Sequence, residues 1–241
     1  MDSKDDVLAL ENLRFTWPRQ ERACLDIAQF SVGKGEAVFL HGPSGCGKST
    51  LLSLLAGVLL PQAGRIALLG TDWRALPQSA RDRYRVDHVG YIFQQFNLLP
   101  YLSALDNVLL PCRFSAQREA GASQGARSAR AAAEGWLEAM GLERPLWQRD
   151  AHQLSVGQQQ RVAAARALIG QPALVIADEP TSALDEDRRD AFLDLLLSAC
   201  ATAHSALVLV SHDRRIAQRF GRQVLLPSIN RAARPDEAVA A

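Results

Sequence analysis

A glycine-rich loop between two apolar runs constrains this sequence most. Residues 37–40 predict a buried strand, and residues 49–56 predict a buried helix. Between these runs, Gly42, Gly47 and Lys48 fit the pattern G-x-x-x-x-G-K-S, in which backbone N–H groups surround phosphate oxygens at a helix N-terminus. A strand that leads through such a loop into a helix predicts an α/β fold.

The loop predicts the binding of a phosphorylated molecule. We expect Lys48 to reach the β and γ oxygens of a nucleotide, and the Ser49 hydroxyl to bind Mg²⁺. The loop alone leaves kinases, GTPases and many ATPases open. Its residues, which we call the phosphate loop, are Gly42, Pro43, Ser44, Gly45, Cys46, Gly47, Lys48, Ser49 and Thr50.

Two adjacent carboxylates follow a second buried strand. Asp178 ends the apolar run 174–177, which places it at the carboxyl edge of a parallel strand, where open α/β sheets bind ligands. We expect Asp178 to hold Mg²⁺ and Glu179 to orient or deprotonate the attacking water. The structural alternative is an acidic cap before Pro180.

Residues 154–158, Leu-Ser-Val-Gly-Gln, open a helix and are called the signature segment below. Ser155 is a good N-cap, so a capped amphipathic helix is the simple interpretation. The functional interpretation depends on the order of several motifs along the chain. Gln94 after a strand, the signature segment, Asp178 with Glu179, residues 182–185 and His212 after a strand follow one another.

With these motifs the chain resembles the ATP-binding-cassette family over about residues 10–226. The resemblance implies ATP and Mg²⁺ as ligands and ATP hydrolysis as the activity. It makes Gln94 the Q-loop glutamine and a metal contact, Asp178 a metal ligand, Glu179 the catalytic base and His212 the switch histidine at the γ-phosphate. Ser155, Gly157 and Gln158 become the phosphate-contacting residues of the signature, and residues 182–185 the D-loop.

The resemblance also implies the fold and the assembly. The expected fold is a P-loop NTPase with a mostly parallel core sheet, an N-terminal antiparallel β subdomain and an inserted helical subdomain. We expect one domain over residues 7–228, with the helical subdomain at about 95–168 and a tail over 229–241. In this family two cassettes sandwich ATP head to tail, so Ser155 and Gly157 would complete the site of a second copy.

An aromatic side chain is expected to stack on the adenine. Trp17 lies where the family usually has a tyrosine, and an indole is a suitable platform for a purine. Phe15 is the alternative, and the choice of Trp17 follows the family position alone.

Two features depart from the family pattern. Val156 replaces the glycine that is common in the middle of the signature, whereas Ser155 and Gly157 are kept. Residues 224–230 lack the glycine turn that many members show, so the resemblance does not support further contacts of the C-terminal segment.

Composition excludes several classes of function. The chain has 27 basic and 26 acidic residues, so its net charge does not favour nucleic acid as a partner. Its four cysteines form no C-x-x-C pair, and the N-terminus does not resemble a secretory signal. The longest apolar run is too short to span a membrane. We therefore expect a cytoplasmic protein whose membrane role comes through a partner, and the family resemblance implies that this partner is a permease.

Residues 101–170 are predicted to be mainly helical. Within them, residues 113–133 are rich in Ala, Ser, Gly and Arg, and we expect a loose exposed connection that enters a helix at about 126–140. A further amphipathic helix is predicted over 187–201, before a strand at 207–210.

Residues 90–108 look like the cassettes of the MacB and LolD group, which serve permeases that export substrates or release lipoproteins. An exposed apolar set there would suit a groove for a permease helix, although part of it would pack in the subdomain core. The set is Phe96, Leu98, Leu99 and Tyr101. The alternatives are an importer cassette, a cassette acting on DNA or ribosomes, and a simple phosphate-loop kinase. The kinase would leave the signature segment and His212 unexplained.

Overall fold

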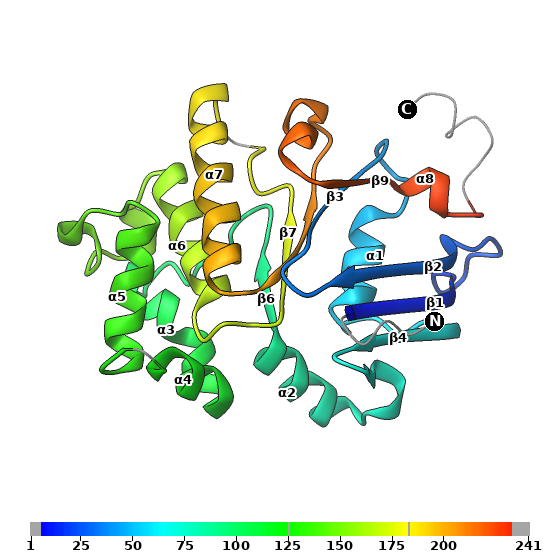
Figure 1. The fold of residues 1–241 in the computed structure, drawn as a ribbon, viewed down its shortest axis with the longest axis horizontal. Helices are drawn as coiled ribbons and strands as arrows, with labels where there is room; N and C mark the ends of the chain where they lie inside the picture. Colours follow the sequence, from blue (N-terminus) through cyan, green and yellow to red (C-terminus); the bar gives the residue numbers. More distant parts are fainter. Residues whose placement is uncertain (1–5, 125, 183, 233–241) are drawn as a thin grey trace. The chain divides into compact units, whose positions relative to one another are not determined.

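The computed structural model describes residues 6–124, 126–182 and 184–232. The chain divides into two compact units, which Figure 1 shows in the colours of the sequence. The first unit comprises Met1–Arg85 and Ala206–Ala241, and the second comprises Val86–Ser205. The second unit is therefore inserted into the sequence of the first.

The first unit begins with an antiparallel sheet of strand order β2-β1-β4-β5. The strand bounds are β1 Asp6–Phe15, β2 Leu25–Gly33, β4 Ala63–Leu68 and β5 Thr71–Asp72. Strand β1 pairs with β2 along most of its length and with β4 on its other side. Leu8, Leu10 and Leu13 of β1 are fully buried, so the sheet presents one apolar face to the core.

The phosphate loop follows the central one of three parallel strands in the first unit. Strand β3 (Ala37–His41) pairs in parallel with β8 (Ala206–Val210) and with β9 (Arg222–Leu225). Val38, Phe39 and Leu40 are fully buried, as expected for a central parallel strand. The predicted strands at 37–40 and 207–210 are thus confirmed.

Helices and 3₁₀ turns complete the first unit. Their bounds are α1 Lys48–Leu55, η1 Trp73–Ala75, η4 Arg214–Arg219 and α8 Leu226–Ile229, and α2 (Gln78–His88) leads into the second unit. Trp73 is fully buried and its indole N–H donates to Leu55 O at 3.2 Å. Gly57 follows the end of α1 with φ +68°, and a Cβ there would lie 2.6 Å from that indole. The left-handed backbone and the nearby indole both favour glycine at this position.

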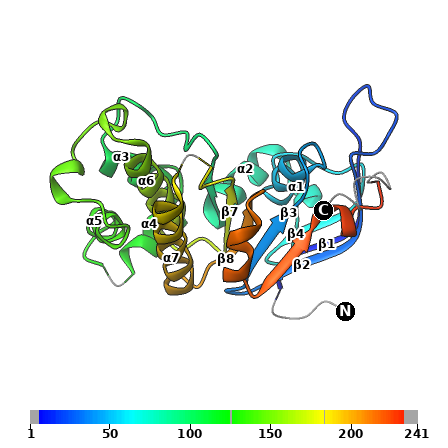
Figure 2. The same ribbon diagram turned by 90° about the horizontal axis from the view of Figure 1, so that it is seen from above.

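The second unit combines two parallel strands with a group of helices. Strand β6 (Val89–Ile92) pairs in parallel with β7 (Leu174–Asp178). The helices, which Figure 2 shows gathered around α6, are α3 Ala104–Phe114, α4 Ala116–Ser123, α5 Ala129–Ala139, α6 Val156–Leu168 and α7 Glu186–Thr202, with 3₁₀ turns η2 Arg144–Leu146 and η3 Ala151–Gln153. A Cβ at Gly90 would lie 2.2 Å from Ala167 O, so glycine allows β6 to approach α6 closely.

The expected loose connection at 113–133 is wrong in its first half. Helix α4 occupies residues 116–123, capped by Ser115, whose hydroxyl accepts from Arg118 N. Arg118 is 1% exposed and donates through Nη2 to Ala167 O at 2.9 Å. This contact anchors α4 to α6, and the composition of the segment did not reveal it. Helix α5 begins at Ala129, three residues later than predicted.

The α/β class and the antiparallel N-terminal sheet are confirmed. The predicted helix at 187–201 is confirmed as α7, and residues 101–170 are mainly helical as predicted. The domain boundaries predicted at 7–228, 95–168 and 229–241 stay a prediction. Residues 233–241 of the expected tail lie outside the described residues.

Candidate functional site

The phosphate loop joins the end of β3 to the start of α1, as predicted. Gly45 has φ +83° and Gly47 has φ +101°, conformations that side chains rarely adopt. A Cβ at Gly47 would also lie 2.9 Å from Leu25 Cδ2. Any other residue at these two positions would therefore be strained in this path of the loop.

The helix that follows the loop begins without a side-chain cap. Gly47 occupies the N-cap position of α1, and glycine has no side chain that could accept a hydrogen bond from the first turn. The first backbone N–H groups of a helix have no partner within the helix, and they carry the positive end of its dipole. This geometry suits an anion that accepts several hydrogen bonds at once.

Lys48 and Ser49 begin α1. Lys48 Nζ donates to Gly42 O at 2.8 Å and to Pro43 O at 2.9 Å, so the ammonium group lies over the loop. Ser49 is exposed. Both side chains are therefore available at the loop, the ammonium group for phosphate oxygens and the hydroxyl for a hydrated cation.

His41 ends β3 immediately before the loop. Burial lowers the pKa of His41, and the positive charges of Arg214 and Lys48 lower it further. A neutral imidazole therefore avoids adding charge repulsion to the cations near the loop. Because the folded-state pKa is lowered, acidification below the ordinary histidine range destabilises the folded state at this residue.

The two candidate aromatic platforms differ in exposure. Phe15 is the last residue of β1 and is 4% exposed, whereas Trp17 lies beyond the strand and is 38% exposed. Their rings meet edge to face with centroids 5.2 Å apart. The Trp17 ring is therefore accessible and is supported from one side by Phe15, whereas the Phe15 ring is not accessible.

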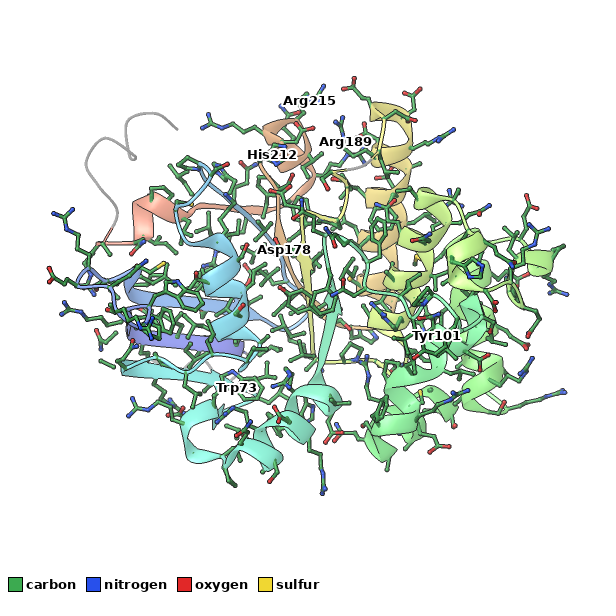
Figure 3. The ribbon with its side chains drawn as sticks, turned by 180° about the vertical axis from the view of Figure 1, so that it is seen from behind. Trp73, Tyr101, Asp178, Arg189, His212 and Arg215 are labelled. Atoms are coloured by element: carbon green, nitrogen blue, oxygen red, sulfur yellow. The ribbon has the colours of Figure 1, made fainter. Side chains whose placement is uncertain are left out.

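His212 follows β8 in the first unit, and Figure 3 labels it. It is exposed, and its neighbour Asp213 caps the short helix η4 by accepting from Arg215 N. The Ser211 hydroxyl accepts from Asp213 N at 3.1 Å, so the backbone on either side of His212 is fixed.

The two carboxylates lie in the second unit, at the carboxyl end of β7. Asp178 is the last residue of that strand and is half-buried (Figure 3). Glu179 has φ +47°, a left-handed conformation that costs a non-glycine residue about 1–3 kcal/mol. Gln160, 1% exposed, donates to Pro180 O at 2.6 Å and so holds the turn after Glu179. Burial raises the pKa of nearby Tyr91, and the charge of Asp178 adds to this effect.

Gln94 lies two residues beyond β6 and is exposed. The following residues Phe96 and Asn97 are both left-handed, with φ of +60° and +48°. Arg166 of α6 donates to the carbonyl oxygens of both, at 2.5 Å from Nη2 to Phe96 O and at 2.7 Å from Nη1 to Asn97 O. The prediction that Phe96 is exposed is wrong, because this turn directs the ring into the core and leaves it 6% exposed.

The signature segment begins α6 with a reciprocal cap. Ser155 N donates to Gln158 Oε1 at 2.9 Å, and Gln158 N donates to Ser155 Oγ at 3.4 Å. Ser155 is exposed and Val156 is 49% exposed. The predicted N-cap is confirmed, and it leaves the Ser155 hydroxyl proton and the first turn of α6 accessible.

A cavity of about 630 Å³ opens beside the signature segment within the second unit. Its wall includes Ser155, Val156, Gly157, Gln158, Arg161, Leu184, Asp185 and Arg188. The cavity thus combines a helix N-terminus with two arginines. Of the predicted D-loop residues, Ala183 lies outside the described residues.

The candidate residues are shared between the two units. The phosphate loop, Trp17 and His212 belong to the first unit, and Gln94, Ser155, Gly157, Gln158, Asp178 and Glu179 belong to the second. Sequence reasoning missed Gln160 and Arg166, which hold the backbone beside Glu179 and Gln94. A polar residue on the buried side of an amphipathic helix is the signal that could have found them.

The candidate residues offer the kinds of oxygen ligand that Mg²⁺ uses. Within residues 6–124, 126–182 and 184–232, no three His, Cys, Asp or Glu side chains form a group that could hold a metal ion. Mg²⁺ commonly uses one or two protein oxygens together with phosphate oxygens and water. The Ser49 hydroxyl in the first unit and the Asp178 carboxylate in the second are each an oxygen group of the type that Mg²⁺ uses.

None of the helices in the described part of the chain is long and apolar enough to cross a membrane.

Comparison with known proteins identifies the family. The family model described as ABC transporter matches residues 25–182. The lipoprotein-releasing system ATP-binding protein LolD of Legionella pneumophila (strain Paris) is 41% identical over 196 residues, which cover 81% of this chain and 83% of LolD. The uncharacterized ABC transporter ATP-binding protein YbbA of Escherichia coli (strain K12) is 40% identical over 202 residues, covering 84% of this chain and 85% of YbbA.

A solved structure agrees in sequence and in fold. It is the dimeric, post-hydrolysis state of the ATP-binding cassette MJ0796, bound to ADP and Pi, with a TM-score of 0.78. MJ0796 is 34% identical, and the match covers 90% of this chain and 93% of that chain. The phosphate-loop fold predicted from the sequence is thereby confirmed. The chain belongs to the ABC transporter family, as an ATP-binding subunit that hydrolyses ATP.

Proposed function

We propose that this chain powers a separate membrane permease of the export or lipoprotein-release type. Support comes from the 41% identity to LolD, a protein of a lipoprotein-releasing system, over 83% of LolD. The chain would lie on the cytoplasmic side of the inner membrane, bound to the permease. This placement is compatible with the lack of a membrane-spanning helix in its described residues.

The phosphate loop is the proposed binding site for the ATP phosphates. Its uncapped helix N-terminus and the left-handed glycines Gly45 and Gly47 provide backbone N–H donors. Lys48 would exchange its two loop carbonyl acceptors for the β and γ oxygens. The accessible indole of Trp17 would stack on the adenine.

Ser49, Gln94 and Asp178 are the proposed contacts of Mg²⁺, directly or through water. When bound, the cation would neutralise charge on the phosphate oxygens. Gln94 is exposed two residues beyond β6, and β6 pairs with β7, the strand that Asp178 ends. The two side chains therefore leave neighbouring strands at the same end of the second unit.

Glu179 is the proposed general base. Its carboxylate would accept a proton from the water that attacks the γ-phosphate. The left-handed backbone at Glu179 and the bond from Gln160 to Pro180 O fix the direction in which this side chain leaves the strand. His212 would donate a hydrogen bond to the γ-phosphate.

A second copy of the chain is the proposed partner at the signature segment. The observation that carries the proposal is the exposure of this segment: the Ser155 hydroxyl and Val156 face solvent at a helix N-terminus, beside a cavity with two arginines. Ser155, Gly157 and Gln158 would contact the γ-phosphate held by the phosphate loop of the other copy. The dimeric state of MJ0796 supports this arrangement.

The permease is proposed to bind at residues 98–101 of the second unit. Tyr101, labelled in Figure 3, is 70% exposed, and Leu98 and Leu99 are partly exposed. The buried Asn107 side chain accepts from Leu99 N and donates to Leu99 O and Leu102 O, so this apolar surface is held in a fixed shape. A preformed surface of this kind suits a docking helix.

Substitution of Glu179 by Gln tests the proposed ATPase. We expect hydrolysis to fall by about 10²- to 10⁴-fold, because the amide cannot accept the proton. Nucleotide affinity should stay unchanged and ATP should then hold the dimer closed, which phosphate release, calorimetry and size-exclusion chromatography would measure. Glu138→Gln makes the same chemical change on an exposed residue and serves as control. Wild-type turnover in Glu179→Gln would remove Glu179 from its role.

The type of transporter needs a separate experiment. The chain should be purified with its permease from membranes, and the bound substrate identified by mass spectrometry. A lipoprotein or an exported molecule is the expected result. A stable complex with a solute-binding protein would instead identify an importer.

A further inference from the structure

The C-terminal segment Leu226–Arg231 contacts the region around the phosphate loop. Figure 1 shows α8 at the start of β2, within the first unit. Asn230 bridges to Ile27 of β2, and Arg231 N donates to Asp26 O at 2.7 Å. The end of the described chain is thus bound to the strand that begins beside the loop.

Asn230 is the centre of this contact. Its side chain is 4% exposed, and its Oδ1 accepts from Asp26 N at 2.8 Å and from Ala232 N at 3.1 Å. Its Nδ2 donates to Cys24 O at 3.0 Å. All three partners are backbone groups, so this one amide fixes the path of the chain as it enters β2.

Cys24 and Leu25 in turn pack on one end of the phosphate loop. A Cβ at Gly47 would lie 2.9 Å from Leu25 Cδ2, 3.4 Å from Cys24 Sγ and 3.6 Å from Cys24 O. Cys24 Sγ also lies 3.8 Å from the Thr50 hydroxyl. A shift of Cys24 and Leu25 would therefore either crowd the left-handed Gly47 or leave it unsupported.

The same C-terminal segment packs on the other end of the loop. A Cβ at Gly42 would lie 3.1 Å from Pro227 Cδ and 3.7 Å from Leu226 Cβ. Leu226 is fully buried and Pro227 is buried, so α8 forms a fixed support behind Gly42. Leu226–Asn230 thus supports both glycines, Gly42 directly and Gly47 through Cys24 and Leu25.

We propose that Asn230 is a positioning residue for ATP binding, which holds Cys24 and Leu25 against Gly47 and so keeps the phosphate loop in its binding shape. Several N–H groups must converge on one phosphate, and a loop held in that shape before binding loses less entropy when the nucleotide arrives. The inference rests on the proposed role of the loop. It also assigns a purpose to a segment in which the family resemblance gave no reason to expect contacts.

The replacement Asn230→Asp tests the link to Cys24. The carboxylate can still accept from Asp26 N and Ala232 N, but it places an acceptor oxygen against Cys24 O. We expect the Kd of the full chain for ATP to rise about tenfold, the effect of losing one buried hydrogen bond. In the complex with its permease, the KM for ATP should rise while kcat at saturating ATP stays within about twofold, since no group that acts on the γ-phosphate changes.

Arg222→Met is the matched control for stability. Arg222 of β9 donates to Ser31 O of β2 at 2.8 Å, so it also joins the C-terminal part to β2, but at the far end of that strand. Methionine keeps the apolar stem and removes this hydrogen bond together with the ion pair from Arg222 Nη1 to Glu36 Oε1 (3.1 Å). We expect a fall in Tm similar to that of Asn230→Asp and an unchanged Kd for ATP.

Lys48→Ala separates the two proposals. If Lys48→Ala weakens ATP binding and Asn230→Asp does not, Asn230 is structural only and the inference is overturned. Equal increases in Kd for Asn230→Asp and Arg222→Met would overturn it as well. If Lys48→Ala itself leaves ATP affinity unchanged, the proposed role of the phosphate loop fails first.

Discussion

The phosphate loop and the signature segment each present a helix N-terminus, and they complete it in different ways. Helix α1 starts at a left-handed glycine with no side-chain cap, whereas α6 starts at Ser155 with a reciprocal cap from Gln158. The first turn of α1 therefore has backbone N–H groups that no side-chain cap engages. In α6 the N–H group of Gln158 already donates to the Ser155 hydroxyl, and the hydroxyl proton of Ser155 is what this N-terminus offers.

This difference indicates different tasks. An uncapped N-terminus is incomplete until an anion arrives, which suits the primary binding of phosphate. A capped N-terminus is stable alone, so its contact with phosphate can be made and broken without unfolding the first turn. Such a contact suits an interface that closes with ATP and opens after hydrolysis.

The largest effect is expected when the phosphate loop is damaged on one chain and the signature segment is damaged on another. Lys48→Ala and Ser155→Arg should each reduce hydrolysis by more than about 100-fold, because each damages both sites of a homodimer. An equal mixture should regain up to about a quarter of wild-type activity, since random pairing gives mixed dimers with one intact site. Phosphate release from the mixture measures this recovery.

The control mixes Lys48→Ala with the double variant Lys48→Ala, Ser155→Arg. No pair of these chains contains an intact phosphate loop, so activity should stay at the level of the single variants. A mixture of the two single variants that regains nothing would contradict the head-to-tail arrangement.

A smaller effect is expected from adding one methyl group to each N-terminus. Gly47→Ala places a Cβ 2.9 Å from Leu25 Cδ2 at φ +101° and should cost about 1–2 kcal/mol of folding free energy, with weaker ATP binding. Gly157→Ala meets only Leu184, at 3.9 Å, and should leave the folding free energy within about 0.5 kcal/mol. Denaturant unfolding and calorimetry measure both. Equal losses of ATP affinity in the two variants would remove the distinction.

The smallest effect is expected from the cap itself. Ser155→Ala should cost about 1 kcal/mol of folding free energy, because it removes the oxygen that accepts from Gln158 N. Ser155→Asp keeps a good cap but brings negative charge to the proposed phosphate contact. We expect Ser155→Asp to unfold like the wild type in urea and to lose ATP-dependent dimerisation. An ATP-dependent dimer of wild-type affinity in Ser155→Asp would mean that Ser155 only caps the helix.

The sequence was sufficient to predict those parts of the site whose shape is set locally. A left-handed glycine, a helix N-cap and an acid at a strand end follow from neighbouring residues, so the phosphate loop, Ser155 and Asp178 were found where expected. Their relation to ATP came from the order of the motifs, which no single motif supplies.

The remaining features depend on residues far apart in the chain. Helix α4 looks loose in the sequence, yet Gly121 approaches the backbone of Gly170 so closely that a Cβ would lie 2.6 Å from Gly170 O. Asn230 contacts Cys24, 206 positions away. A local pattern cannot show such contacts, because the polar residues that make them look like ordinary surface residues.

Helix α6 makes different contacts at its two ends. Its first turn carries Ser155, and its last turn carries Arg166, which holds Phe96 O and Asn97 O just before the exposed Tyr101. At 1.5 Å per residue, these two points are about 16.5 Å apart along the axis. Because a helix of this length bends little, a tilt at the Ser155 end must appear at the other end as a displacement of Phe96 and Asn97, which Arg166 holds. This geometry suits the transmission of movement from the Ser155 end of α6 to the exposed apolar surface at residues 98–101.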